Sequence, residues 1–213
     1  MSAPDRPKGE YRRALPEGIP VSAARLLIVP GLGDSPSEHW QSRLQASHRN
    51  AVRVVQHDWL APQLERWSAR VASTLARVGG GPWIAVAHSF GVLALVHHLT
   101  QQPDAPLAAA LLVAPADPDK FGLGAALPAR PLPFATTMVL SRNDPWLGLA
   151  EGRHWAARWG CHVVDLGEAG HINVASGHRS LPFAVRWVTQ VQQRLARQSR
   201  PERAAFGEWS FAV

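Results

Sequence analysis

The chain has 213 residues, a formal net charge of +6 and one cysteine, which is enough for one domain of ordinary size. A single cysteine excludes a framework of internal disulfide bonds. Residues 1–20 mix charges with prolines and hold no apolar signal-peptide core, and the longest apolar run, 107–114, is too short to cross a bilayer. We therefore expect a cytoplasmic protein that does not associate with membranes.

The positive charge alone does not indicate a nucleic-acid-binding protein. Lys8 and Lys120 are the only lysines, and the arginines are spread along the chain rather than gathered on one predicted helix or loop. We expect no nucleic-acid partner. The sequence also lacks the paired Cys and His spacing of a metal site and the Walker-type phosphate loop, so no metal and no cofactor are predicted.

In chain order, short apolar runs alternate with helical patterns. A strand at 26–29 and another at 52–55 precede a helical segment that begins near Leu60 and carries apolar residues at helical spacing; further strands are predicted at 83–87, 108–114, 136–140 and 162–166. Helices are expected after Ser89, from about 146 to 159 and from about 181 to 195. This alternation predicts an α/β fold, a mostly parallel six-stranded sheet between two layers of helices.

The domain is expected to cover residues 23–196, between a poorly ordered tail at 1–22 and a second tail at 197–213. Within it, the Pro-rich span 121–133 is the longest irregular piece and follows the fourth strand. An entrance loop or a small cap could lie there.

Ligands of open parallel sheets bind beyond the carboxyl ends of the strands, and Ser89 follows the third strand directly. It lies in Ala-His-Ser-Phe-Gly, residues 87–91, between an apolar run and a second apolar run that reads as a helix. Small residues around a serine at such a turn are typical of a nucleophile elbow, with Ala87 where the usual pattern has its first glycine. A serine that only caps the following helix is the simpler alternative.

A serine hydroxyl needs a base and a carboxylate that orients the base. Asp144 follows the fifth strand and His171 follows the sixth, so the chain order is Ser, Asp, His, the order of α/β-hydrolases. Alternatives remain for both partners. Asp117, Asp119 and Asp165 are other candidate acids, and His178 is the main rival base, whereas His88 is expected to point to the opposite side of the turn.

Two backbone N–H groups are predicted to bind the negative oxygen that develops on a substrate carbonyl. They belong to Phe90, which follows the nucleophile, and to Leu32 in the loop after the first strand. Gly31 and Gly33 flank Leu32, but the segment lacks the third glycine and the acidic partner of a dinucleotide-binding fingerprint.

Several blocks together resemble one family: Pro30-Gly31-Leu32 leading to His39-Trp40, then Asp58-Trp59, and the segments 87–91, 141–145 and 169–177. They are similar to the small α/β-hydrolases related to the retinoblastoma-binding serine hydrolase, over residues 26–191. The resemblance implies a nearly lidless hydrolase with Ser89, Asp144 and His171 as its triad and with the first strand between the second and third. The chain departs from the family at Pro30, where a histidine is common, and at 178–182, where Gly-x-Trp-Pro is common. The second departure concerns the pocket wall and not the triad.

The function predicted from these residues is hydrolysis of carboxylic esters with small or medium acyl groups through an acyl-enzyme. Two alternatives share the fold: acyl transfer to an alcohol or amine, and a catalytically weak protein that binds a protein partner. A pocket blocked by Phe90 or Trp146 would favour the binding protein.

Overall fold

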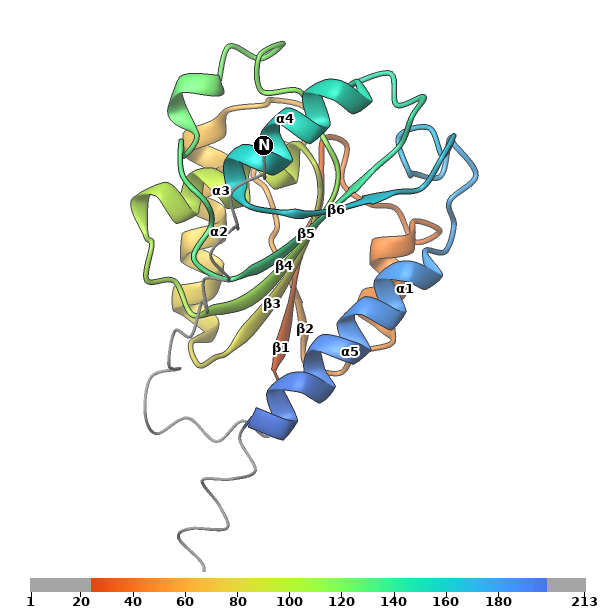
Figure 1. Cartoon of the computed structure of the whole chain (residues 1–213). Coiled ribbons are helices and arrows are strands. Elements are labelled where there is room, and N and C mark those ends of the chain that lie inside the picture. The colour runs from red at the N-terminus through yellow and green to blue at the C-terminus, as the bar shows by residue number, and fades with distance from the viewer. Residues whose placement is uncertain (1–23, 199–213) are drawn as a thin grey trace, which may run out of the picture.

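A sheet of six parallel strands runs through the computed structural model, which describes residues 24–198 (Figure 1). The strand order is β2-β1-β3-β4-β5-β6, so the first strand lies between the second and third, as the resemblance implied. The predicted tails at 1–22 and 197–213 lie outside the described residues, apart from Arg197 and Gln198 at the end of the final helix. The strands are β1 (Arg25–Val29), β2 (Ala51–Arg53), β3 (Trp83–Ser89), β4 (Leu107–Pro115), β5 (Ala135–Leu140) and β6 (His162–Asp165).

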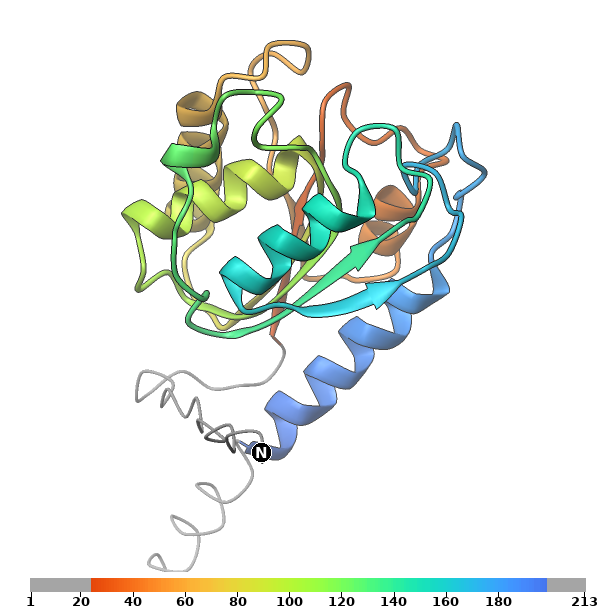
Figure 2. The ribbon, with the colours of Figure 1, turned by 45° about the horizontal axis from the view of Figure 1, so that its top comes forward.

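Helices cover both faces of this sheet, and both views show the two layers (Figures 1 and 2). On one face lie α2 (Leu64–Val78), α3 (Phe90–Gln101) and α4 (Leu149–Trp159); on the other lie α1 (Trp40–Ala46) and α5 (Pro182–Gln198). Because both faces are covered, the central strands are apolar at nearly every position. The predicted three-layer α/β fold is confirmed.

Three helices differ from the sequence prediction, among them α2, which begins at Leu64 rather than near Leu60. The prediction did not include α1, which has only seven residues and buries just two large apolar side chains, Trp40 and Leu44. The α4 helix begins three residues later than expected because the Asp144 carboxylate accepts the Trp146 backbone N–H and holds that segment in a turn.

The Pro-rich span 121–133 packs against the body of the domain. Leu127 and Leu132 are buried in the core beside α4, and the Pro128 carbonyl accepts a hydrogen bond from Arg158. A single turn of 3-10 helix (Gly124–Ala126) lies within the span. None of the helices in residues 24–198 has the length and apolar character that a bilayer crossing requires.

Candidate active site

Ser89 lies at a strained turn between β3 and α3. Its backbone φ of 54° is in a region that only glycine adopts readily. The turn also brings α3 against the end of β1: a Cβ on Gly91 would lie 2.2 Å from the Pro30 carbonyl oxygen, and one on Gly31 would lie 2.6 Å from Ser89 Cβ. Ala87 is accommodated because its methyl group lies in the core. The tight packing therefore requires glycine at 31 and 91 but not at 87.

The Ser89 hydroxyl bonds to a histidine and not to the helix that follows. Ser89 occupies the N-cap position of α3, yet its side chain makes no capping hydrogen bond. Its Oγ lies 2.9 Å from His171 Nε2, and His171 Nδ1 lies 3.0 Å from both carboxylate oxygens of Asp144. A carboxylate only accepts hydrogen bonds, so the proton of the neutral imidazole belongs on Nδ1 and Nε2 is free to accept the serine proton.

The alternative acids and the alternative base named from the sequence have other partners. Asp165 pairs with Arg142 and Arg153, and the Gly167 backbone N–H is the main cause of the lowered pKa of its carboxyl group. Asp117 accepts the Asp119 backbone N–H and lies 3.9 Å from Lys120 Nζ. His178 donates its backbone N–H to the Asn173 carbonyl. Among the predicted candidates, the structure brings together Ser89, Asp144 and His171.

The loop that carries His171 is held by polar groups from the β5–α4 loop. Asn143 Oδ1 accepts the Gly170 backbone N–H at 2.7 Å, and the Ser141 hydroxyl bonds both to Asn143 Oδ1 and to the Ala169 backbone N–H. The Asp144 side chain is only 2% exposed and that of His171 is 9% exposed. The acid and the base are therefore fixed by the same two loops and shielded from water, which strengthens their interaction.

Leu32 and Phe90 both lie next to Ser89, one in space and one in the chain. Phe90 is the first residue of α3, and Leu32 shares a small pocket with Ser89 and His171. Within residues 24–198, neither backbone N–H donates a hydrogen bond. Gln41 holds the loop of Leu32 in place, since its amide donates to the Val29 and Val86 carbonyls and accepts from Ser35 Oγ. Two free donors near Ser89 suit a negatively charged oxygen.

The pocket beside Ser89 is small and open to solvent. Its volume is about 150 Å³, and His39, His88 and Asn173 contribute polar walls. Phe90 is fully buried in the core, and Trp146 is 55% exposed beside His171, with ring centroids 6.2 Å apart. Neither residue lines the pocket. The condition that would have favoured a binding protein, a pocket blocked by Phe90 or Trp146, is not met.

The two sides of Ser89 differ in character. One, which we call the histidine side, comprises His39, Trp40, His88, Asp144 and His171. The other, the aromatic side, comprises Trp59, Trp67, Phe90 and Phe121, whose rings meet edge to face with centroids 5.1 to 5.7 Å apart. Hydrogen bonds organise the first side, and close packing organises the second.

Burial keeps two histidines on the histidine side neutral. It lowers the pKa of His39 to about 4, assisted by the nearby Arg53 guanidinium, and lowers the pKa of His88 well below its usual range, assisted by His171. Burial also raises the pKa of the Cys161 thiol to about 12, so this cysteine is protonated at neutral pH and is no rival nucleophile.

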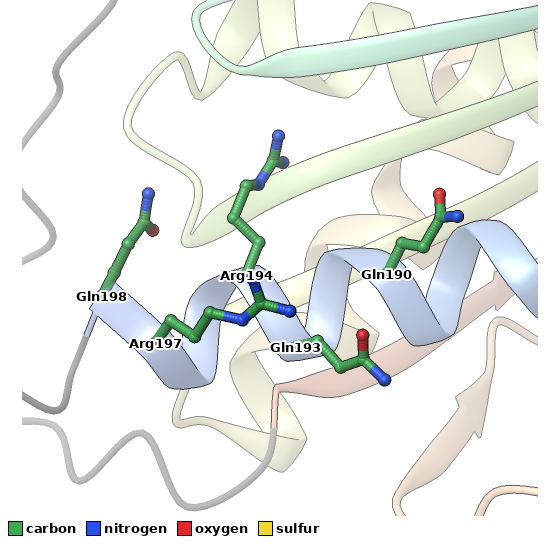
Figure 3. A pocket seen from close by; sticks show the side chains of 5 residues that line it. All are labelled: Gln190, Gln193, Arg194, Arg197 and Gln198. Carbon is green, nitrogen blue, oxygen red and sulfur yellow. The ribbon is translucent and has the colours of Figure 1, made fainter.

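A larger hollow of about 430 Å³ lies along the last turns of α5 and is lined by glutamine and arginine side chains (Figure 3). Because α5 runs back from the His171 loop, this hollow lies at the opposite end of the sheet from Ser89 (Figure 1). It takes no part in the site. In the described part of the chain, no group of three or more His, Cys, Asp or Glu side chains could hold a metal ion.

Comparison with known proteins gives consistent results. The family model for serine hydrolases matches residues 26–200. Among solved structures, a protein described as a YdeN-like hydrolase from Pectobacterium atrosepticum is 35% identical, with 82% of this chain and 94% of that chain covered and a TM-score of 0.77. No curated protein matches the chain.

Two more distant structures share the fold. The ydeN gene product of B. subtilis is 21% identical, with coverage of 79% of this chain and 98% of that chain and a TM-score of 0.63. The esterase RhEst1 from Rhodococcus sp. ECU1013 is 14% identical, with coverage of 84% and 92% and a TM-score of 0.59. The specific link to the retinoblastoma-binding hydrolase stays a prediction.

Proposed function

The chain belongs to the serine hydrolase family, and we propose that it hydrolyses carboxylic esters. In this proposal Ser89 is the nucleophile, His171 the general base and Asp144 the acid that orients the base. The observation that carries the proposal is the continuous hydrogen-bonded series from Ser89 Oγ through the His171 ring to Asp144. A series of this kind is what activates a hydroxyl that is otherwise a weak nucleophile.

The first half of the reaction forms an acyl-enzyme. His171 Nε2 takes the Ser89 proton while Oγ attacks the ester carbonyl carbon, and the negative oxygen of the tetrahedral intermediate is bound by the Leu32 and Phe90 N–H groups. When the intermediate collapses, the bond to the alcohol oxygen breaks, and the alcohol leaves with the proton from His171. Asp144 stabilises the imidazolium that exists between these two steps.

The second half releases the acid. His171 takes a proton from water, the resulting hydroxide attacks the acyl carbon, and the Ser89 Oγ leaves and recovers its proton from His171. The pocket of about 150 Å³ beside Ser89 is smaller than the roughly 300 Å³ or more of typical drug-sized sites. This supports small or medium acyl groups as substrates.

Acyl transfer to an alcohol or amine would use the same residues. The open pocket gives water access to Ser89, which supports hydrolysis as the main outcome. Product analysis with an added primary alcohol would detect transfer as a second ester.

The test is covalent labelling with a fluorophosphonate, read by intact mass, together with turnover of p-nitrophenyl acetate. Wild type should gain one label, and Ser89→Ala should gain none and lose at least about 1,000-fold in kcat. Ser73→Ala is the matched control because Ser73 is an exposed residue on α2 whose hydroxyl donates to the Arg70 carbonyl of its own helix. An unlabelled, folded wild type would refute the proposal, as would labelling that persists in Ser89→Ala.

A further inference from the structure

His88, the residue before the nucleophile, contacts the backbone of His171. Its ring centroid lies 4.9 Å from that of His171 and 5.1 Å from that of His39, and His88 lines the same pocket as Ser89. Its Nε2 lies 2.9 Å from the His171 carbonyl oxygen. A carbonyl oxygen only accepts, so Nε2 carries the proton and His88 donates.

The carbonyl of the next residue is held in the same way. Trp40 Nε1 donates to the Ile172 carbonyl oxygen at 2.8 Å, and the Trp40 ring meets the His88 ring edge to face with centroids 5.9 Å apart. His88 and Trp40 are 5% and 2% exposed. Two buried ring N–H donors therefore bind two consecutive backbone carbonyls of the loop that carries His171.

That loop needs such support because its backbone is strained. Ile172 has a φ of 49°, in the left-handed region. A branched side chain in the left-handed region costs about 1 to 3 kcal/mol and persists only where the surroundings enforce it. Ile172 is fully buried and its carbonyl accepts the Trp40 hydrogen bond, and both features hold its backbone in this conformation.

The position of the His171 ring depends on this backbone. The ring must reach Ser89 Oγ and Asp144 at the same time, at 2.9 Å and 3.0 Å. Asn143 holds the loop from the β5–α4 side through Gly170, and His88 and Trp40 hold it from the other. Since His88 is adjacent to Ser89 in the chain, its hydrogen bond ties the base directly to the strand that carries the nucleophile.

We propose that His88 and Trp40 are positioning residues that clamp the backbone of His171 and Ile172, and so set the distance between the base and Ser89. The inference rests on the proposed function for its catalytic consequence. The clamp itself concerns only the geometry of the loop. His88 transfers no proton in the reaction, because its Nε2–H stays hydrogen-bonded to the His171 carbonyl oxygen.

The main test compares His88→Leu, which removes the donor, with His88→Gln, whose amide N–H extends about as far from the backbone as imidazole Nε2. For p-nitrophenyl acetate, His88→Leu should lower kcat by about 10- to 100-fold with little change in KM, the size of effect expected when a reacting group is misplaced. His88→Gln should recover most of that loss. The rate of fluorophosphonate labelling should follow the same order.

Two further variants separate positioning from general damage. His98→Leu is the matched control, because His98 is a buried histidine on α3 with a pKa that burial likewise lowers, and it should behave as wild type. Trp40→Phe keeps an aromatic ring but removes the second donor, so it should also lower kcat. This variant tests the clamp if His88→Leu does not fold.

A proton NMR measurement reads the clamp without turnover. The proton between His171 Nδ1 and Asp144 should give a resolved low-field signal in wild type and His88→Gln, and a weakened or lost signal in His88→Leu. The clamp is refuted if folded His88→Leu keeps wild-type kcat, or if His88→Gln is as impaired as His88→Leu. A wild type that is neither labelled nor active would refute the proposed function, and the NMR comparison would then decide the clamp alone.

Discussion

The histidine side and the aromatic side meet at two consecutive residues, Ser89 and Phe90, yet they are built on different principles. On the histidine side, directional hydrogen bonds of 2.7 to 3.0 Å fix the His171 loop through both its side chain and its backbone. On the aromatic side, Trp67 and Phe121 press their rings against Phe90 at 5.1 and 5.2 Å. Such contacts are individually weak and tolerate small displacements.

Atomic precision is needed on the histidine side. Proton transfer between Ser89 and His171 depends on the placement of single atoms, and a displacement of about 1 Å can cost about 100-fold in rate. The aromatic side has only to keep the start of α3 and the elbow in place, which packing achieves. Changes on the histidine side should therefore affect the rate more than the stability, and changes on the aromatic side the reverse.

Among changes on the histidine side, Asp144→Asn should reduce the rate most. The amide keeps the size of the side chain but favours the wrong tautomer of His171, so kcat for p-nitrophenyl acetate should fall by about 10,000-fold. Steady-state kinetics and a thermal melt of the same sample would show a large rate loss with a nearly unchanged melting temperature.

Asp117→Asn is the matched control for this change. Asp117 is the acid at the end of β4 that the sequence left as an alternative, and its carboxylate caps a turn at Asp119. It should retain kcat within about threefold of wild type, the scale of a substitution outside the reacting groups. Equal losses in the two variants would mean that the acid has been assigned wrongly.

The sheet and the Ser, Asp and His residues could be predicted from the sequence because local patterns along the chain indicate each of them. Apolar runs mark the strands, and the chain order of Ser89, Asp144 and His171 follows from which strand each residue ends. The supporting contacts were not predictable in this way. His88 reaches His171 across 83 residues, and Trp40 reaches Ile172 across 132, in each case to a backbone carbonyl whose position no side-chain pattern encodes.

The α1 helix was missed for a related reason. Its seven residues are too few for a helical period to emerge, and it is held by single contacts such as Gln41 to the Val29 and Val86 carbonyls. Gln41 and Trp40 are two residues in α1 whose polar groups support the neighbouring loops. Only tertiary structure shows what they contact.

On the aromatic side, Phe121→Ala removes a partly buried ring from its edge-to-face contact with Phe90. The free energy of unfolding should fall by about 2 kcal/mol, below the roughly 3 to 5 kcal/mol of a fully buried phenylalanine. Denaturant unfolding checks this, with Phe121→Leu expected to lie between the variant and wild type.

The same Phe121→Ala sample tests whether the two sides are independent. Its kcat for p-nitrophenyl acetate should stay within about threefold of wild type, because the Phe121 ring packs against the Phe90 side chain and does not line the Ser89 pocket. A rate loss as large as that of His88→Leu would show that the aromatic side also positions the catalytic atoms, and the comparison between the sides would fail.

One effect appears only in acid and belongs to the histidine side. His39 has a pKa of about 4 in the folded protein against 6.5 for an exposed histidine. As the pH falls below 6.5, the unfolded chain binds a proton that the folded protein does not, so stability present above pH 6.5 is lost towards pH 4. At pH 5 this residue should account for about 2 kcal/mol of the loss, from about 1.4 kcal/mol per pH unit.

His39→Asn isolates that contribution. Asparagine can still cap α1, as His39 does by accepting the Gln41 backbone N–H, but it does not titrate. The stability of the variant at pH 7 also reflects the change in packing. The quantity to compare is therefore the slope of the unfolding free energy between pH 7 and pH 5. That slope should be shallower in His39→Asn than in wild type. The slope of Phe121→Ala should equal that of wild type, because the aromatic rings carry no proton in this range. Equal slopes for His39→Asn and wild type would mean that burial does not hold His39 neutral, and that the two sides of the elbow respond to acid alike.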